Sequence, residues 1–171
     1  YEEALRLVGE EVREGNPSPG NKTGGITTLE EKSLGCIHKG GHSPVNAVYD
    51  YAKQVAPKSG LVIMDTPGND PSSVAAMVAG GAQVVVFSTG RGTPTGNPIA
   101  PVIKITGNRI TFANMEDNID VDASPIIYGG DLTQMGDELL QLVADVASGK
   151  QTKAESLGYM EMAIARVCNY V

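Results

Sequence analysis

A chain of 171 residues, 41% hydrophobic and 19% charged, is long enough to bury a core, so we expect a globular domain and not a disordered segment. The net charge of −7 arises in residues 111–171, where ten Asp/Glu accompany three Lys/Arg, and this acidic end argues against nucleic acid as a partner. No apolar run approaches the roughly 20 residues of a membrane span, and two cysteines are too few for a disulfide framework, which favours a cytoplasmic protein that contacts no membrane.

The first third of the chain combines a helical pattern with a long polar segment. Residues 1–14 place apolar side chains at helical spacing before Gly15, which predicts a helix that ends there. Residues 16–41 are polar and rich in glycine, and a loop of this length in a compact domain is usually functional or disordered. The Ser-Pro pair at residues 43–44 suits a helix start, so we expect a second helix that reaches about Val55.

Short apolar strands alternate with helices in the middle of the chain. Apolar runs at residues 61–64 and 83–87 flank a helical stretch at 71–78, for which Asp70 is the expected N-cap. This order predicts adjacent parallel strands joined by a right-handed crossover. We therefore expect an α/β fold of the three-layer (αβα), Rossmann-like kind with a mainly parallel sheet. A further strand and two closing helices are expected at residues 102–105, 132–147 and 153–167.

Two polar loops follow the first two predicted strands, Asp65–Asp70 and Ser88–Gly96. Ligands of an open parallel sheet bind beyond the carboxyl ends of its strands, so both loops should face one cleft. The second loop surrounds the guanidinium of Arg91 with hydroxyls and backbone N–H groups, which suits bidentate capture of a carboxylate. The alternative is an ordinary Gly/Pro turn in which Arg91 is merely exposed to solvent.

The glycine-rich segment near the N-terminus, residues 15–35, offers amide, ammonium and carboxylate groups on a backbone that can approach a ligand closely. Thr28 and Glu31 have the spacing of a capping box, so one glutamate has a structural explanation. Lys22 and Lys32 are candidates for neutralising a substrate carboxylate or for abstracting a proton.

Metal ligands are less clearly marked in the sequence. One cysteine and two histidines lie within residues 36–42, but no second His/Cys cluster completes a tetrahedral site. The carboxylates of Glu31, Asp65, Asp120 and Asp122 suit Fe, Mn or Mg at least as well. Asp120 and Asp122 alternate as on an extended segment, although a solvated acidic turn also explains them.

Three motifs in chain order resemble the altronate/galactarate dehydratase family: Gly15–Lys22, Glu31–Gly35 and Thr89–Pro94. The likeness continues through residues 65–70 and 118–120 and covers nearly the whole chain. It implies removal of water from a sugar acid such as altronate or galactarate by metal-assisted acid/base chemistry. The implied cofactor is a divalent metal, Fe(II) first, with Mn or Mg as alternatives.

The chain length favours a single α/β domain over residues 1–171, and the resemblance implies that it is the C-terminal fragment of a longer enzyme whose small β-rich N-terminal domain is absent here. That domain, a small hydroxy acid and a second copy in a homodimer are the expected partners. Residues 94–98 depart from the sugar-acid enzymes, which leaves the substrate open and keeps a sulfolactate sulfo-lyase-like C–S lyase as an alternative. A non-catalytic phosphate- or nucleotide-binding α/β module is the other alternative, although neither GxxxxGK[ST] nor GxGxxG is complete.

The chemistry implied by the family needs a carboxylate clamp, acid/base groups and a cation beside a developing enediolate. The residues assigned to these roles are Lys22, Glu31, Lys32 and Arg91 for catalysis; Asn16, Asn21, Ser88, Thr89, Arg91 and Thr93 for substrate binding; and Asp65 and Asp120 for the metal.

Overall fold

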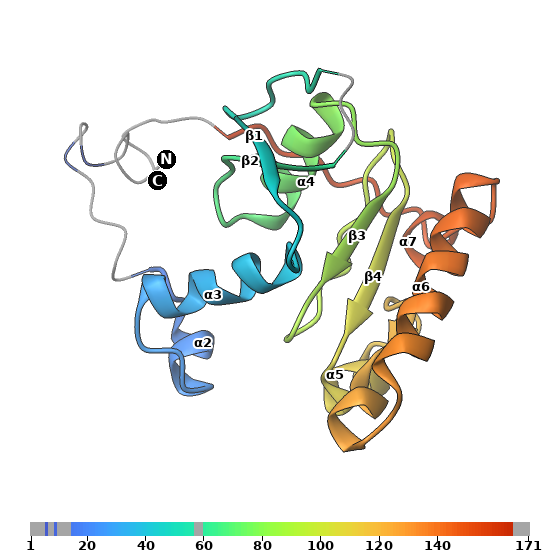
Figure 1. The fold of residues 1–171 in the computed structure, drawn as a ribbon. Coiled ribbons are helices and arrows are strands. Elements are labelled where there is room, and N and C mark those ends of the chain that lie inside the picture. The colour runs from blue at the N-terminus through green and yellow to red at the C-terminus, as the bar shows by residue number, and fades with distance from the viewer. Residues whose placement is uncertain (1–5, 7–8, 10–14, 57–59, 166–171) are drawn as a thin grey trace. The chain divides into compact units, whose positions relative to one another are not determined.

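The computed structural model describes residues 6, 9, 15–56 and 60–165 (Figure 1). The chain divides into two compact units. Unit 1 contains residues 1–51, 55–67 and 165–171, and unit 2 contains residues 52–54 and 68–164. The helix expected over residues 1–14 lies outside the described residues except at two positions, and the single domain over 1–171 stays a prediction.

Unit 1 consists of short helices and a two-stranded parallel sheet. In this sheet Val48 lies opposite Ile63. The side chain of Thr28 accepts a hydrogen bond from the N–H of Glu31 and begins the longer helix, as the capping pattern predicted. The elements are α2 (Pro19–Thr23), α3 (Leu29–Lys39), β1 (Val45–Tyr49) and β2 (Leu61–Met64).

Two sequence predictions in unit 1 were wrong. The long loop expected at residues 16–41 contains α2 and α3, because acidic residues in the first turn of α3 and basic residues in its last turn support a helix in spite of an internal glycine. The helix expected at residues 43–55 is replaced by the strand β1, whose Val45, Val48 and Tyr49 are residues that favour extended backbone.

Unit 2 is built on a three-stranded sheet in the order β3-β4-β5, and both strand pairs are parallel. Val85 of β3 lies opposite Val102 of β4, and Ile105 of β4 lies opposite Val121 of β5. Figure 1 shows β3 and β4 side by side. The strands are β3 (Val85–Ser88), β4 (Val102–Thr106) and β5 (Val121–Asp122).

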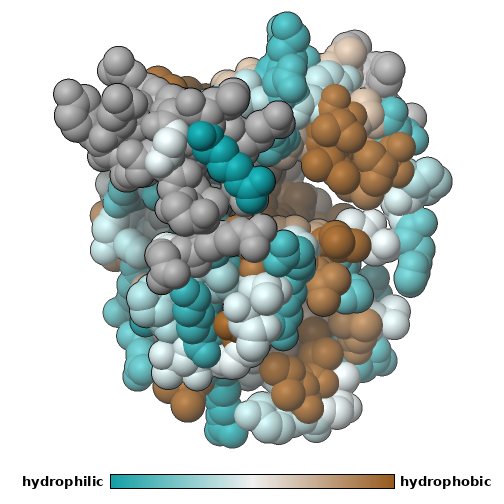
Figure 2. Space-filling model, turned by 90° about the vertical axis from the view of Figure 1, so that its left-hand side faces the viewer, coloured by the Kyte–Doolittle hydropathy of each residue, from teal (hydrophilic) through white to brown (hydrophobic). Residues whose placement is uncertain are grey.

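The core of unit 2 lies between helix α4 (Asp70–Ala79) and the sheet. Val74 of the helix packs with Val85 and Val102, and partly buried Met77 and Phe87 pack against this cluster. The central strand β4 is buried along most of its length, which is typical of a strand covered on both faces. Large apolar side chains also reach the surface of the molecule, as the brown areas of Figure 2 show.

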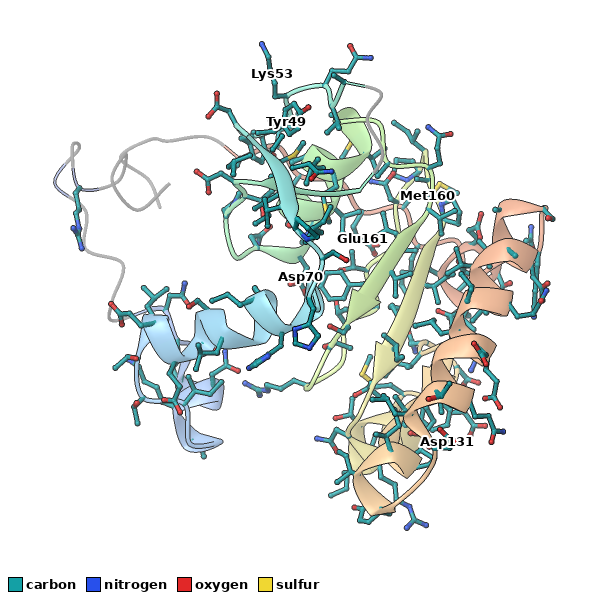
Figure 3. The ribbon with its side chains drawn as sticks, in the orientation of Figure 1. Tyr49, Lys53, Asp70, Asp131, Met160 and Glu161 are labelled. Carbon is teal, nitrogen blue, oxygen red and sulfur yellow. The ribbon has the colours of Figure 1, made fainter. Side chains whose placement is uncertain are left out.

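The remaining helices of unit 2 confirm some predictions and correct others. The helix expected over residues 132–147 is confirmed, and Asp131, labelled in Figure 3, begins it by accepting hydrogen bonds from two backbone N–H groups. The helix expected over 153–167 ends at Ser156, because Gly158 adopts a left-handed φ of 72° that terminates it. The elements are α5 (Arg109–Asn114), η1 (Ser124–Tyr128), α6 (Leu132–Ala147) and α7 (Lys153–Ser156).

The expected fold class holds only in its coarser form, a mixed α/β chain with small parallel sheets. The strand at residues 61–64 pairs with β1 and not with β3, so the predicted adjacency of the first two expected strands was wrong. The N-cap of α4 is Asn69, not Asp70, since the Asn69 side chain accepts a hydrogen bond from the N–H of Ser72. None of the described helices combines the length and apolar character needed to cross a membrane.

Candidate functional site

The loop that carries Arg91 in unit 2 follows β3, and we call residues 88–97 the Arg91 loop. Its first part is tied to the neighbouring elements by hydrogen bonds. The N–H of Thr89 donates to the carbonyl oxygen of Ile105 at 3.0 Å, and the hydroxyl of Thr111 donates to the carbonyl oxygen of Gly90 at 2.8 Å. Both anchors lie within two residues of Arg91. On the other side of Arg91, the N–H of Gly92 donates to the hydroxyl of Thr89 at 3.0 Å, so the exposed Arg91 side chain extends from a backbone that is held on both sides.

Two glycines of the Arg91 loop are required by the space around them. Gly92 has a φ of 87°, and a Cβ there would collide with the sulfur of Met115. A Cβ on Gly96 would collide with the carbonyl oxygen of Tyr159, which is backbone and cannot turn aside. These positions explain why the sequence of this loop repeats glycine at short intervals.

Some hydroxyls of the Arg91 loop are buried and bond within the loop, whereas that of Ser88 belongs to an exposed residue. Thr93 and Thr95 are buried, and their hydroxyl oxygens lie 2.8 Å apart and bond to each other. The hydroxyl of Thr89 accepts a hydrogen bond from the N–H of Gly92 at 3.0 Å. Ser88, the last residue of β3, is exposed three residues before Arg91. Thr93 thus shapes the loop in this structure, and its contact with a substrate stays a prediction.

Lys104, on the central strand β4, was not anticipated as a functional residue. Its side chain is fully buried, and its Nζ donates to the carbonyl oxygens of Pro94 and Thr95 at 3.2 and 3.3 Å. Burial lowers the pKa of Lys104 below its ordinary value, while the negative charges of Asp120 and Glu161 oppose that shift. A lysine inside the apolar run of residues 102–105 was the available signal in the sequence, because alternation places it on the same face as Val102.

Asp120 connects β4 to the start of α7. One carboxylate oxygen accepts the N–H of Lys104 at 2.7 Å, and the other accepts the N–H of Lys153 at 2.8 Å. Both oxygens therefore serve the backbone of unit 2. Asp120 thus has a structural role in this unit, and its role as a metal residue stays a prediction.

In unit 1 the asparagine-proline motif and α3 approach each other at one point. The Nζ of Lys32 donates to the side-chain oxygen of Asn16 at 2.8 Å, and a small hollow beside this pair is lined by residues 16–17 and 27–30. Asn21 donates from its side-chain amide to the hydroxyl of Ser18 at 3.1 Å. Asn16 and Lys32, predicted from separate motifs, thus lie together.

Glu31 has a structural role at the start of α3. Its Oε2 accepts hydrogen bonds from the hydroxyl and the N–H of Thr27 at 2.6 and 2.7 Å, and these bonds lower the pKa of Glu31. The reciprocal half of the predicted capping box thus reaches Thr27 and not Thr28. An ionised, exposed carboxylate bound in this way suits a helix cap better than an acid catalyst.

The predicted site residues are shared between the two units. Asp65 belongs to unit 1 and Arg91 to unit 2, so the common cleft of their two loops stays a prediction. Among the described residues, no three His, Cys, Asp or Glu side chains are grouped so that they could hold a metal ion. The residues assigned to unit 1 are Asn16, Asn21, Lys22, Glu31, Lys32 and Asp65, and those in unit 2 are Ser88, Thr89, Arg91, Thr93 and Asp120.

Comparison with known proteins decides the family. Residues 1–169 match the family described as D-galactarate/Altronate dehydratase, C-terminal. The chain belongs to this family. It is 44% identical over 149 residues to the altronate dehydratase of Escherichia coli K12, a match that covers 87% of this chain and 30% of that enzyme. The resemblance predicted from the three glycine-rich motifs is thereby confirmed.

Two further relatives of this chain differ from each other in the activity that their names state. The galactarate dehydratase (L-threo-forming) of Escherichia coli K12 is 40% identical over 153 residues, covering 88% of this chain and 29% of that enzyme. The (2R)-sulfolactate sulfo-lyase subunit beta of Chromohalobacter salexigens is 38% identical over 159 residues, covering 92% of this chain and 41% of that subunit. The chain therefore spans about 30% of the length of the two dehydratases that it matches.

Proposed function

We propose that this chain is the part of a hydro-lyase that binds the carboxylate end of an aldonate or aldarate, such as altronate or galactarate, from which water is eliminated. The observation that carries the proposal is the exposed guanidinium of Arg91 on a loop fixed by hydrogen bonds and by two sterically required glycines. A guanidinium presents parallel N–H donors that match the two oxygens of a carboxylate. Membership of the dehydratase family supplies the reaction class.

The proposed chemistry begins beside the carboxylate that Arg91 holds. Removal of the proton on the adjacent carbon produces an enediolate, and positive groups near its oxygens stabilise the added charge. A proton donor then assists departure of the β-hydroxyl as water. A carboxylate clamp that forms a bidentate pair fixes the acidic C–H in one orientation, so that the base meets it in each turnover.

Lys32 is our candidate for the second positive group. Its Nζ is held by the neutral amide oxygen of Asn16 at 2.8 Å, so this partner orients the ammonium without neutralising it. Lys22 remains the alternative from the same segment. Whether either lysine serves as base or as electrostatic partner is tested by replacing each with Met and Arg, because an electrostatic role tolerates Arg while a base does not.

A divalent metal, Fe(II) first and Mn or Mg next, belongs to the proposal as an expectation from the family resemblance. Of the two residues assigned to it, Asp120 already accepts a backbone N–H on each oxygen, and the described residues contain no group of three His, Cys, Asp or Glu side chains that could hold an ion. We therefore derive no step through a metal. Metal analysis of the purified protein at its full natural length, compared with an Asp65→Asn variant, tests the remaining assignment.

Cleavage of a carbon–sulfur bond is the second candidate function. The match to a sulfolactate sulfo-lyase subunit favours it, with an identity of 38% against 44% for altronate dehydratase. Both reactions eliminate a group from a hydroxy carboxylate, so the same Arg91 clamp serves either. The released product, water or sulfite, distinguishes the two.

A substrate panel tests the proposed function. The protein at its full natural length is incubated with aldonates, aldarates and sulfolactate, and 2-keto products and sulfite are measured. We expect 2-keto acid from an aldonate or aldarate and no sulfite. Sulfite release from sulfolactate alone establishes the C–S lyase instead. Tight nucleotide binding without any turnover of these acids refutes both and supports a nucleotide-binding module.

The setting of the activity is proposed on the same basis. The dehydratase relatives are about three times longer than their match to this chain, so we propose that further domains of the same enzyme complete the site. A cytoplasmic homodimer with its sheets in a three-layer arrangement completes the proposal. Light scattering of the protein at its full natural length measures the oligomeric state directly.

A further inference from the structure

Lys104 is the one described lysine whose side chain is fully buried, and the proposed reaction gives it no role. An ammonium inside a protein loses its hydration, which is unfavourable unless hydrogen bonds and opposite charge compensate. Methionine fills nearly the same space without that cost. The nitrogen of Lys104 must therefore contribute something that its volume does not.

That contribution is visible in the hydrogen bonds of its Nζ. The Nζ donates to two backbone carbonyl oxygens of the Arg91 loop, on the consecutive residues Pro94 and Thr95. The following residue, Gly96, donates its N–H to Oε2 of Glu161 at 3.1 Å. Three successive residues of the loop are thus held by two charged side chains of opposite sign, and Figure 3 labels Glu161 on the segment that follows α7.

The charges around Lys104 fit this arrangement. Burial lowers the pKa of Lys104, the negative charges of Asp120 and Glu161 oppose this shift, and the positive charge of Lys153 adds to it. Asp120 also accepts the backbone N–H of Lys104 at 2.7 Å, which holds the lysine at a fixed point on β4. The backbone of Lys104 is therefore fixed on β4, and its side chain extends from there to the Arg91 loop.

We propose that Lys104 is a positioning residue for the Arg91 loop, holding the carbonyl groups of Pro94 and Thr95 so that Arg91 is presented in one orientation. The kinetic part of this inference rests on the proposed function, in which Arg91 binds the substrate carboxylate. The structural part, anchoring of the loop, does not. Two separate measurements address the two parts.

The first measurement is cleavage by trypsin after Arg91, since this residue is exposed and a protease must draw the surrounding loop into an extended form. In the protein at its full natural length, Lys104→Met should accelerate this cleavage by about tenfold or more. Lys150→Met is the matched control, because Lys150 is an exposed lysine of the same unit whose ion pair, with Asp145 at 3.6 Å, lies outside the Arg91 loop. Its cleavage rate at Arg91 should equal that of the unchanged protein.

Glu161→Ala provides a second test on an exposed residue, which keeps the question answerable if Lys104→Met does not fold. Loss of the acceptor for Gly96 should also accelerate cleavage after Arg91, by a smaller factor. Unchanged cleavage in a folded Lys104→Met protein overturns the proposal. If only Glu161→Ala folds, unchanged cleavage in that variant overturns it.

The second measurement is a double-mutant cycle on kcat/KM with Arg91→Lys and Lys104→Met. If Lys104 acts through Arg91, the loss caused by Arg91→Lys, about a hundredfold alone, should shrink to about tenfold or less when Lys104 is already Met. Lys104→Arg, which keeps the cation and its donors, should restore part of the activity. If the kcat/KM losses of the two single variants multiply fully in the double variant, Lys104 does not act through Arg91 and the proposal fails. Should Arg91→Lys leave the kinetics unchanged, the proposed clamp fails, while the trypsin result still decides the anchoring.

Discussion

The two glycine-rich segments of this chain look alike in sequence and differ in structure. In the Arg91 loop of unit 2, Gly92 and Gly96 lie against a side chain and a backbone carbonyl that leave no room for a Cβ. In unit 1, Gly25 and Gly35 have no atom within 4 Å of the place where a Cβ would lie. Gly92 and Gly96 therefore serve close packing in the Arg91 loop, whereas Gly25 and Gly35 lie in open space.

The same contrast appears in the polar groups. In the Arg91 loop the buried hydroxyls of Thr93 and Thr95 bond to each other. The buried Lys104 donates hydrogen bonds to two backbone carbonyl oxygens of the same loop. Neither α2 nor α3 of unit 1 has a buried residue. We infer that the Arg91 loop is organised before any ligand binds. The glycine-rich segment of unit 1 instead presents exposed groups around which a ligand or another part of the enzyme can pack.

The largest expected effect is on stability, from Gly96→Ala. The new methyl group meets the carbonyl of Tyr159, and relief requires movement of backbone, so unfolding should become easier by about 3 kcal/mol. Chemical denaturation measures this change. Gly90→Ala is the control in the same loop, because a Cβ there has nothing within 4 Å and should leave the stability nearly unchanged. Equal stability of the two variants would contradict close packing at Gly96.

Next in size is the effect of Arg91→Lys on turnover in the protein at its full natural length. Lysine keeps the charge but not the parallel donors of the guanidinium, so kcat/KM should fall by on the order of a hundredfold. The thermal midpoint should not change, since the anchors of the loop are backbone groups and other side chains. A loss of activity that follows the loss of folded protein would remove Arg91 from the site.

A smaller effect with the opposite sign is expected for Gly35→Ala in α3. The position is inside a helix with open space around it, and alanine favours helix by about 0.5–1 kcal/mol over glycine. A higher denaturation midpoint checks this prediction. A stabilised protein that also loses turnover would show that unit 1 uses this open space for its ligand, which is the sharper outcome.

The smallest effect is the pH dependence contributed by Glu31. Hydrogen bonds from Thr27 lower the pKa of Glu31 in the folded state, so its contribution is present above the unfolded-state value of 4.5 and is lost as the pH falls through the folded-state value. Glu31→Gln should therefore lower the thermal midpoint slightly at pH 7 and have no effect at about pH 2. If the thermal midpoints of Glu31→Gln and the unchanged protein still differ at acidic pH, the stabilisation by Glu31 does not come from its charge.

The sequence predicted the family and most of unit 2, because these depend on local patterns and on motifs in order. Helix α6 begins at an aspartate N-cap and keeps its apolar period throughout, and its predicted bounds agree with the structure. The strand β4 was likewise predicted to within one residue.

The errors came from pairings that local patterns do not encode. The strand at residues 61–64 pairs with β1, and this pairing depends on tertiary contacts that a local pattern does not contain. The Ser-Pro pair at residues 43–44 resembles a helix start, but the following valines and tyrosine favour extended backbone beside β2. Lys104 was overlooked because lysine in a sequence suggests surface, and only the fold shows two carbonyl oxygens within its reach.

The carboxylate of Asp120 has a consequence for the motions of unit 2. Its two oxygens accept the amide hydrogens of Lys104, in a strand, and Lys153, at the first turn of a four-residue helix. A helix this short has little intrinsic stability, and its first amide would ordinarily exchange with solvent quickly. Because one planar group holds both amides, release of either strains the other, and the two hydrogens should exchange in a common opening. The short helix then shares the slow exchange of the central strand.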